Sequence, residues 1–379
     1  MRASSRSEVD PFIVMDVMEA ARRREEAGHR VIHMEVGQPG TPAPAGARAA
    51  LVRAMEAAPL GYTVALGMPA LRRRIARLYA EWYGVEVNPE RIVVTPGASG
   101  AFILAFTALF EAGERVGLGL PGYPSYRHIL TALSLRPAGI ETREANRFQP
   151  VPDDVPEGLA GLIVASPANP SGTMLDREAL AALVERTREI GAAFVSDEIY
   201  HGLHYDRPAV SALQVSDDVV VVNSFSKYFS MTGWRVGWLV VPEGEIRRYE
   251  RLAQNLFICP PHASQIAALA AMDCTEELEA NRAVYAENRR LMIEGLPGAS
   301  LGHFAPPDGA FYVYTDVGHL TGDSRALAAE ILEQAGVAVT PGLDFDPARG
   351  GRMLRLSYAA ATGDIAEGLE RLAAFTAGR

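Results

Sequence analysis

Short apolar runs that alternate with longer amphipathic runs constrain the fold of this chain more than any other feature. Between about residues 91 and 245, most of these runs are separated by segments with helical spacing, such as 176–190. The runs with the length and composition of strands are RIVVT (91–95), RVGLGL (115–120), LRPAGI (135–140), GLIVAS (161–166), AAFVSDE (192–198), VVVVNSF (219–225) and RVGWLVV (235–241). Strands that alternate with helices indicate an α/β fold with a mostly parallel sheet. We therefore predict a seven-stranded sheet covered by helices on both faces.

The segments on either side of this region predict a second, smaller domain. Residues 10–27 have helical spacing, residues 31–35 form a short predicted strand, and a proline-rich turn, GQPGTPAPAG, follows. Two helical stretches, near 243–255 and 261–290, precede a final region with the order strand, helix, short strand, strand, helix. We predict that residues 46–280 form a large domain around this sheet, the domain to which the motifs below assign cofactor binding. Residues 1–45 and 281–379 are predicted to form a small α+β domain.

Charge, hydropathy and cysteine content exclude several classes of function. The formal net charge of −10 disfavours a protein that wraps nucleic acid or lies on an anionic membrane. No apolar run approaches the roughly 20 residues needed to span a bilayer, and the first residues, MRASSRSEVDPF, lack the apolar core of a secretory signal. Two cysteines are too few for a disulfide framework, and His201 with His204 lacks a third zinc ligand. We expect a cytoplasmic protein without a metal site.

Lysine usage sets one residue apart from all others. Of the 36 basic residues, 35 are arginine and one is lysine, Lys227. Arginine stays charged at any working pH, whereas a lysine amine can lose its proton and form a Schiff base. On this count alone, a surface lysine retained by chance explains the pattern as well as a catalytic lysine does.

Polar clusters follow several predicted strands, at the edge of the sheet where ligands collect in such folds. The segment GASG (97–100) opens a helix, whose backbone N–H groups can bind an anion. Asn169 lies between two prolines, and Asp197 leaves a buried strand, where a helix N-cap is the commoner role. The segment NSFSKYFSMTGWR (223–235) brings hydroxyls, the lysine amine and Arg235 together, which suits a phosphate beside an imine. Each cluster alone could equally be a turn or a polar loop.

Taken in order, these motifs resemble the fold-type I, pyridoxal-phosphate-dependent aminotransferases of class I/II, the aspartate-aminotransferase-like family. The most specific element is S-x-S-K followed by an arginine eight residues after the lysine, with D-x-x-Y thirty residues before the lysine and N-P-x-G further upstream. The resemblance runs nearly end to end. It implies an enzyme that moves an amino group from an L-amino acid to a 2-oxo acid by a ping-pong mechanism, with pyridoxal 5′-phosphate as cofactor.

The resemblance also implies a role for each matching residue of the cofactor site. Lys227 matches the lysine that forms the internal aldimine and then shuttles the proton at the substrate Cα. Asp197 matches the carboxylate that keeps the pyridine nitrogen protonated, and Tyr200 is the third residue implied in catalysis. The residues that match cofactor contacts are Asn169 and Tyr200 at the ring 3′-oxygen, Tyr123 stacked on the ring, and Gly97, Ala98, Ser99, Ser224, Ser226 and Arg235 around the phosphate.

Further matches concern the substrate and a second subunit. Arg355, in MLRLSYA, matches the arginine that binds the substrate α-carboxylate, and Gly37 and Asn169 match other contacts of the substrate. Tyr62, in GYTVALGMPALR, matches a tyrosine that reaches the phosphate in the neighbouring subunit. The resemblance therefore implies a homodimer with shared active sites.

Substrate preference and reaction class stay open on the sequence. One bacterial subgroup of the family binds dicarboxylates with a lysine in the phosphate loop, where this chain has Ser99, and the N-terminal segment PFIVM is apolar. We expect neutral or apolar amino acids to be preferred over aspartate. The alternatives are a carbon–sulfur β-lyase of the same fold and a non-enzymatic, aminotransferase-like sensor domain of a transcription regulator. The acidic charge disfavours the sensor domain.

Overall fold

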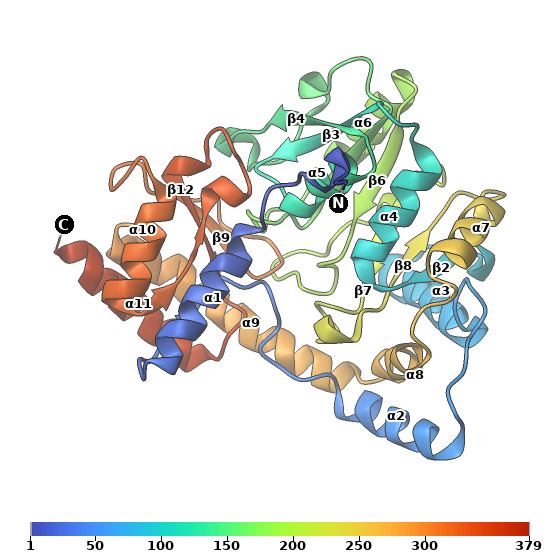
Figure 1. The fold of residues 1–379 in the computed structure, drawn as a ribbon, viewed down its shortest axis with the longest axis horizontal. Helices are drawn as coiled ribbons and strands as arrows, with labels where there is room; N and C mark the ends of the chain where they lie inside the picture. The colour runs from blue at the N-terminus through green and yellow to red at the C-terminus, as the bar shows by residue number, and fades with distance from the viewer. Residues whose placement is uncertain (1, 379) are drawn as a thin grey trace.

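A seven-stranded sheet forms the centre of the larger part of the molecule (Figure 1). The structure is a computed structural model and describes residues 2–378. The strands are β2 (Ile92–Thr95), β3 (Arg115–Leu120), β4 (Arg136–Glu141), β5 (Gly161–Ala165), β6 (Ala193–Asp197), β7 (Val220–Ser224) and β8 (Gly237–Val240). Their order is β2-β8-β7-β6-β5-β3-β4, and β8 alone runs antiparallel to its neighbours. The predicted mostly parallel sheet is confirmed, with every predicted run forming a strand.

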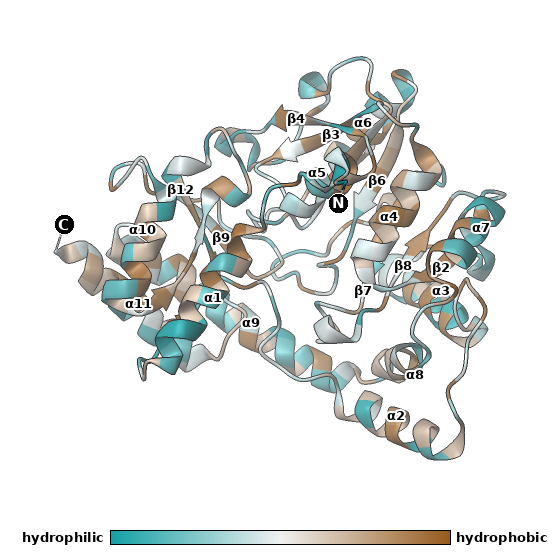
Figure 2. Cartoon of the chain, viewed as in Figure 1, coloured by the Kyte–Doolittle hydropathy of each residue, from teal (hydrophilic) through white to brown (hydrophobic). Residues whose placement is uncertain are grey.

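Helices cover both faces of this sheet. Val94 and Trp238 pack in one hydrophobic cluster and Val93 and Leu239 in the other, so neighbouring residues of one strand face opposite cores. One face carries α3 (Pro69–Tyr83), α6 (Arg177–Glu189) and α8 (His262–Ala271), and the other carries α4 (Gly97–Leu109), α5 (Pro124–Ala132) and α7 (Ile246–Leu256). Burial on both faces explains why β2, β5, β7 and β8 are continuous apolar runs, whereas the edge strand β4 is mostly exposed. Figure 2 colours much of α4 as hydrophobic, in keeping with its position against the sheet.

The smaller part combines the two ends of the chain. A three-stranded antiparallel sheet has the order β11-β12-β9. Its elements and those beside it are α1 (Ile13–Glu26), β1 (Ile32–His33), β9 (Tyr312–Asp316), α10 (Ser324–Glu330), β10 (Val337–Ala338), β11 (Thr340–Pro341), β12 (Met353–Ser357) and α11 (Thr362–Ala377). Because β1 pairs with β10 in parallel, the N-terminal segment joins the C-terminal elements (Figure 1). This agrees with the order of elements predicted for the last part of the chain.

The predicted helix over 261–290 is wrong as a single element. The structure divides it into α8 and α9 (Thr275–Gly295), because the chain turns at 272–274 with Asp273 exposed. No glycine or proline marks that turn. The long helix α9 crosses the proposed domain boundary at residue 280, and α2 (Ala45–Ala57) begins at the other boundary. None of the described helices has the length and apolar character required to cross a membrane.

Candidate active site

A pocket lies at the edge of the large sheet where β3, β5, β6 and β7 end, facing the smaller part. Most residues predicted for the site line it. Those residues are Gly37, Ala98, Ser99, Tyr123, Asn169, Asp197, Tyr200, Ser226, Lys227, Arg235 and Arg355. Because the carboxyl ends of parallel strands meet at one edge, side chains from distant parts of the sequence meet in this pocket.

Lys227 is half-buried in the turn after β7, and its Nζ donates a hydrogen bond to the carbonyl oxygen of Gly37. Burial lowers the pKa of its amine to about 7, with further lowering by the positive charges of Arg355 and Arg235. The negative charge of Asp197 acts in the opposite direction. Near neutral pH, a large fraction of this amine is therefore unprotonated and nucleophilic.

Asp197, the last residue of β6, is buried in the floor of the pocket. Its Oδ2 accepts a hydrogen bond from the hydroxyl of Tyr126, and its Oδ1 accepts one from the backbone N–H of Ile199 at 3.1 Å. Burial raises the pKa of the carboxyl to about 6, while these two donors and Lys227 lower it. The chain directly after Asp197 forms turns rather than a helix, so the carboxylate is not a helix cap. It can face a cationic group in the pocket.

The start of α4 and Arg235 form a site suited to an anion. Gly97 begins the helix with φ of 75°, and a Cβ at this position would lie 2.5 Å from an Nη atom of Arg235. The N–H groups of the first helical turn have no partners within the helix, and the helix dipole favours negative charge there. Arg235 donates from Nη1 to the carbonyl oxygen of Thr232 at 2.8 Å and is otherwise exposed. Glycine at residue 97 is thus required for the close approach of this guanidinium.

Three predicted contacts are not among the lining residues: Gly97 at the start of α4, Ser224 and Tyr62. Ser224 is buried behind Ser226, where its hydroxyl lies 2.9 Å from the Ser226 hydroxyl and 3.1 Å from the carbonyl oxygen of Val236. It supports Ser226 and the turn before Lys227. Tyr62 is 83% exposed on the segment between α2 and α3, away from the pocket.

Arg355, on β12, carries a buried guanidinium at the opposite side of the pocket. Its Nη1 donates to Oδ1 of Asn169 at 3.1 Å, and its Nη2 donates to the carbonyl oxygen of Glu35. Its Nε is buried and has no hydrogen-bond partner, and no carboxylate forms an ion pair with it in the described chain. A buried guanidinium without a carboxylate is costly unless an anion completes it. The site therefore suits a ligand carboxylate.

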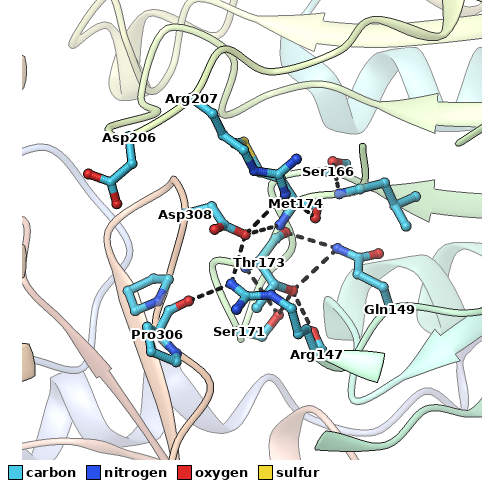
Figure 3. A network of polar contacts seen from close by, with 12 residues as sticks. Arg147, Gln149, Ser166, Ser171, Thr173, Met174, Asp206, Arg207, Pro306 and Asp308 are labelled. Atoms are coloured by element: carbon cyan, nitrogen blue, oxygen red, sulfur yellow. Dashed lines mark hydrogen bonds and ion pairs between the residues drawn. The ribbon is translucent and has the colours of Figure 1, made fainter. Parts of the chain in front are cut away.

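The turn that carries Asn169 is held by contacts to several distant segments (Figure 3). Asp308 Oδ2 accepts hydrogen bonds from the backbone N–H of Met174 at 2.8 Å and from Arg147 at 2.9 Å. Gln149 donates to the carbonyl oxygen of Thr173 at 2.9 Å. These contacts join the loop after β5 to the segment before β9, and so fix the amide of Asn169 against Arg355.

Two tyrosines of the pocket were missed by the sequence reasoning. Tyr126 follows Tyr123 by one helical turn, a spacing that could have indicated a second ring on the same side. Tyr312, on β9, lies with its hydroxyl 2.8 Å from that of Tyr200 and its ring 4.5 Å from the guanidinium carbon of Arg355. A Cβ at Gly37 would lie 1.8 Å from the Tyr312 hydroxyl, so only glycine fits there.

The remaining wall is apolar and comes largely from the N-terminal segment. It includes Phe12, Val14 and Met15, with Val36 beside them. Lys227, Arg235 and Arg355 are the cations among the described lining residues. The histidines after Tyr200 lie elsewhere: the Nε2 of His201 is 2.8 Å from the carbonyl oxygen of Ser166, a structural contact.

A lysine amine of low pKa, a carboxylate and an anion site at this edge of an α/β sheet define the fold-type I enzymes that depend on pyridoxal phosphate. The family described as aminotransferase class I and II matches residues 30–372. The chain is 46% identical to the valine–pyruvate aminotransferase of Mycobacterium tuberculosis, over 98% of this chain and 97% of that protein. It therefore belongs to the class I and II aminotransferases and is an enzyme rather than a sensor domain.

Solved structures agree with this assignment. An aminotransferase from Mycobacterium tuberculosis superposes with a TM-score of 0.97 at 45% identity, covering 100% of both chains. The aspartate aminotransferase of Thermus thermophilus with maleate gives a TM-score of 0.92 at 30% identity, covering 99% of this chain and 100% of that one.

Proposed function

We propose that this enzyme transfers the amino group of a neutral or apolar L-amino acid to a 2-oxo acid in two half-reactions, with pyridoxal phosphate held in the pocket described above. The observation that carries the proposal is the single lysine of the chain. It lines the pocket together with Asp197, Arg235 and Arg355, and the pKa of its amine is lowered to about 7.

The residues present fit pyridoxal phosphate. Gly97 leaves room for Arg235 to approach the free N–H groups of α4, a combination that suits a phosphate dianion. We assign Ala98, Ser99 and Ser226 to the same group, with Ser224 supporting Ser226. When bound, the cofactor supplies an electron sink for the bond broken at the substrate Cα.

The ring would lie between the phosphate site and Lys227. We assign Asp197 to its nitrogen, Asn169 and Tyr200 to its 3′-oxygen, and Tyr123 to its face. Buried Asp197 holds a proton on an opposing nitrogen because an ion pair there is less costly than an isolated buried charge.

Arg355 and Lys227 have separate roles in the reaction. Arg355 binds the substrate α-carboxylate through the guanidinium edge that has no protein carboxylate, and Gly37 allows the close approach of this part of the chain. Lys227 would remove the proton at the substrate Cα and give it back later in the same half-reaction. A pKa near the operating pH suits an amine for both steps. Ping-pong order follows because both substrates use the same arginine.

Three observations support neutral or apolar substrates. The wall formed by Phe12, Val14 and Met15 offers no charge to a side-chain carboxylate. Ser99 stands in the phosphate loop, where a lysine would serve a dicarboxylate. A relative at 46% identity is named as a valine–pyruvate aminotransferase, which makes valine and pyruvate the first pair to test.

We also propose a homodimer with shared sites. Large apolar side chains are exposed on either side of Tyr62 in the sequence, at Val52, Met55 and Val64. Leu256 and Ile258 are also exposed, and they precede the segment 259–262 that lines one hollow with Tyr62. Clustered exposed apolar residues mark interaction surfaces. Light scattering of the eluted protein should give twice the chain mass, and Tyr62→Phe should speed loss of cofactor on dialysis. A fully active monomer would contradict the shared site.

The first experiment is the absorption spectrum of the purified protein before and after each of a panel of amino acids. Loss of the visible band with valine or alanine, and its return with pyruvate, would establish both half-reactions. Specificity constants for valine, alanine and leucine should exceed that for aspartate. Release of pyruvate and ammonia from a cysteine-type substrate without amino transfer would instead indicate the β-lyase.

A further inference from the structure

Helix α1 begins without a cap from its own sequence. Its N-cap residue, Phe12, has no side-chain hydrogen bond to the helix. A carboxylate from the other end of the chain takes that place. Oδ1 of Asp344 accepts from the backbone N–H of Ile13 at 3.2 Å, and Oδ2 accepts from that of Val14 at 3.3 Å. Asp344 is 1% exposed and lies in the turn Gly342–Asp344 after β11.

Both bonds pair backbone N–H groups at the start of α1. The first N–H groups of a helix have no partners within it, and a carboxylate there also interacts favourably with the helix dipole. Asp344 forms no side-chain ion pair with a described cation, although the charges of Arg355 and Arg127 act on it. Arg127 donates to the backbone carbonyl oxygen of Asp344 at 2.7 Å, which fixes the turn itself. Both oxygens of the carboxylate therefore accept hydrogen bonds from the first turn of α1.

The residues next to these two amides form the apolar wall of the pocket. Phe12, Val14 and Met15 line it, and the ring of Phe12 meets that of Tyr123 edge-on at 6.0 Å. Val14 is both a donor to Asp344 and a wall residue. The position of the wall over the pocket thus depends on a residue that does not line it.

We propose that Asp344 is a positioning residue for substrate selection: by capping α1 it holds the apolar wall where a branched aliphatic side chain of the donor amino acid would contact it. This inference rests on the proposed function. Alanine reaches the wall less than valine does, so the preference for valine over alanine depends on the cap. Reaction at the Cα does not depend on the cap, because Lys227 and Arg355 are held by other contacts.

The test compares Asp344→Asn with Asp346→Asn. Asp346 is similarly buried in the same segment, but among the described residues its carboxylate accepts hydrogen bonds from Ala348 and Arg349 and none from α1. For Asp344→Asn, the ratio of kcat/KM for valine to that for alanine should fall about two- to fivefold, because the amide keeps one acceptor oxygen but loses the second acceptor and the charge that interacts with the helix dipole. The loss should lie in KM, because the wall contacts substrate and transition state alike. Asp346→Asn should leave the ratio unchanged.

Hydrogen exchange supplies a readout that needs no turnover. Amides at the start of α1 should exchange faster in Asp344→Asn than in wild type, and at the wild-type rate in Asp346→Asn. If Asp344→Asn does not fold, Asp344→Ser, which likewise keeps one acceptor and lacks the charge, serves with the same expectation. Unchanged exchange, or faster exchange with an unchanged valine-to-alanine ratio, overturns the inference. A wild-type protein that uses neither amino acid would refute the proposed function, and exchange would still test the hold of Asp344 on α1.

Discussion

Tyr126→Phe tests how the pocket keeps Asp197 charged. Asp197 is buried, and its two hydrogen-bond donors are the Tyr126 hydroxyl and the backbone N–H of Ile199. Burial has already raised the pKa of this carboxyl to about 6. Removing the hydroxyl withdraws one of the two donors and leaves the ring in place, so the change is confined to the charge balance of Asp197.

The magnitude follows from the strength of one hydrogen bond. A hydrogen bond to a charged group contributes about 1.5–3 kcal/mol. Since one pKa unit corresponds to about 1.4 kcal/mol, the pKa of Asp197 should rise by about 1–2 units. A raised pKa means that the carboxylate is lost at a higher pH on acidification. The acidic limb of the activity profile should therefore move to higher pH by about 1–2 units, while activity above it stays closer to wild type.

The assay is the pH dependence of kcat/KM for amino transfer between pH 5 and 9. Bound cofactor opposite Asp197 would lower the pKa in both proteins, so the measured quantity is the difference between the two profiles. Tyr249→Phe is the matched control, because that hydroxyl is buried on α7 without a described hydrogen-bond partner. Coincident acidic limbs for Tyr126→Phe and wild type would refute the role given to this hydroxyl.

Three further predictions concern other groups of the site. Lys227→Ala should abolish turnover in a stopped-flow assay, and Lys227→Arg should do no better, since arginine stays protonated. Arg355→Ala should raise KM by about 10- to 100-fold with a smaller change in kcat, because it removes a charged contact to the α-carboxylate. Glu35 raises the pKa of His33 to about 9, so this pair stabilises the fold fully below pH 6.5 and loses that contribution as the pH rises through 9. Chemical denaturation should show a loss of about 1–2 kcal/mol over that range, discounted because His33 is partly exposed, and a flatter profile for His33→Asn.

Each of these has a result that would contradict it. Residual turnover in Lys227→Arg would mean that charge, rather than a free amine, is needed at that position. A fall in kcat alone for Arg355→Ala would remove it from substrate binding. Equal pH profiles of stability for His33→Asn and wild type would show that the pair with Glu35 does not contribute in solution.

The sheet could be predicted because its strands are buried on both faces. Burial on both sides requires apolar residues at every position, and VVVV at 219–222 or GLIV at 161–164 shows this directly. The break between α8 and α9 leaves no such mark, because it contains neither glycine nor proline and both sides keep helical spacing. A helix end set by packing cannot be located from local pattern.

The same distinction applies to the site. Asp197 and Lys227 follow strands, so chain direction and sheet topology bring them to one edge, and motif spacing indicated both. The spacing of Tyr126 from Tyr123 does not indicate its contact with Asp197, and nothing in the sequence indicates the contact of Asp344 with α1. Tyr126 meets Asp197 across 71 residues, and Asp344 meets α1 across 331 residues, between segments whose relative position depends on the whole fold. Contacts of this kind are properties of tertiary structure.

The reactivity of Lys227 is also a property of the tertiary structure. A lone lysine in the sequence has an ordinary pKa of 10.5, at which its amine is almost fully protonated at neutral pH. Burial lowers that value to about 7 and raises the pKa of Asp197 to about 6, so one physical cause moves both groups toward neutrality from opposite sides. The charges of Arg355 and Arg235 lower the pKa of Lys227 further, whereas the hydrogen bond from Tyr126 limits the rise in the pKa of Asp197. The pocket thereby makes an uncharged amine and a charged carboxylate available in the same pH range, which neither residue could provide on an exposed loop.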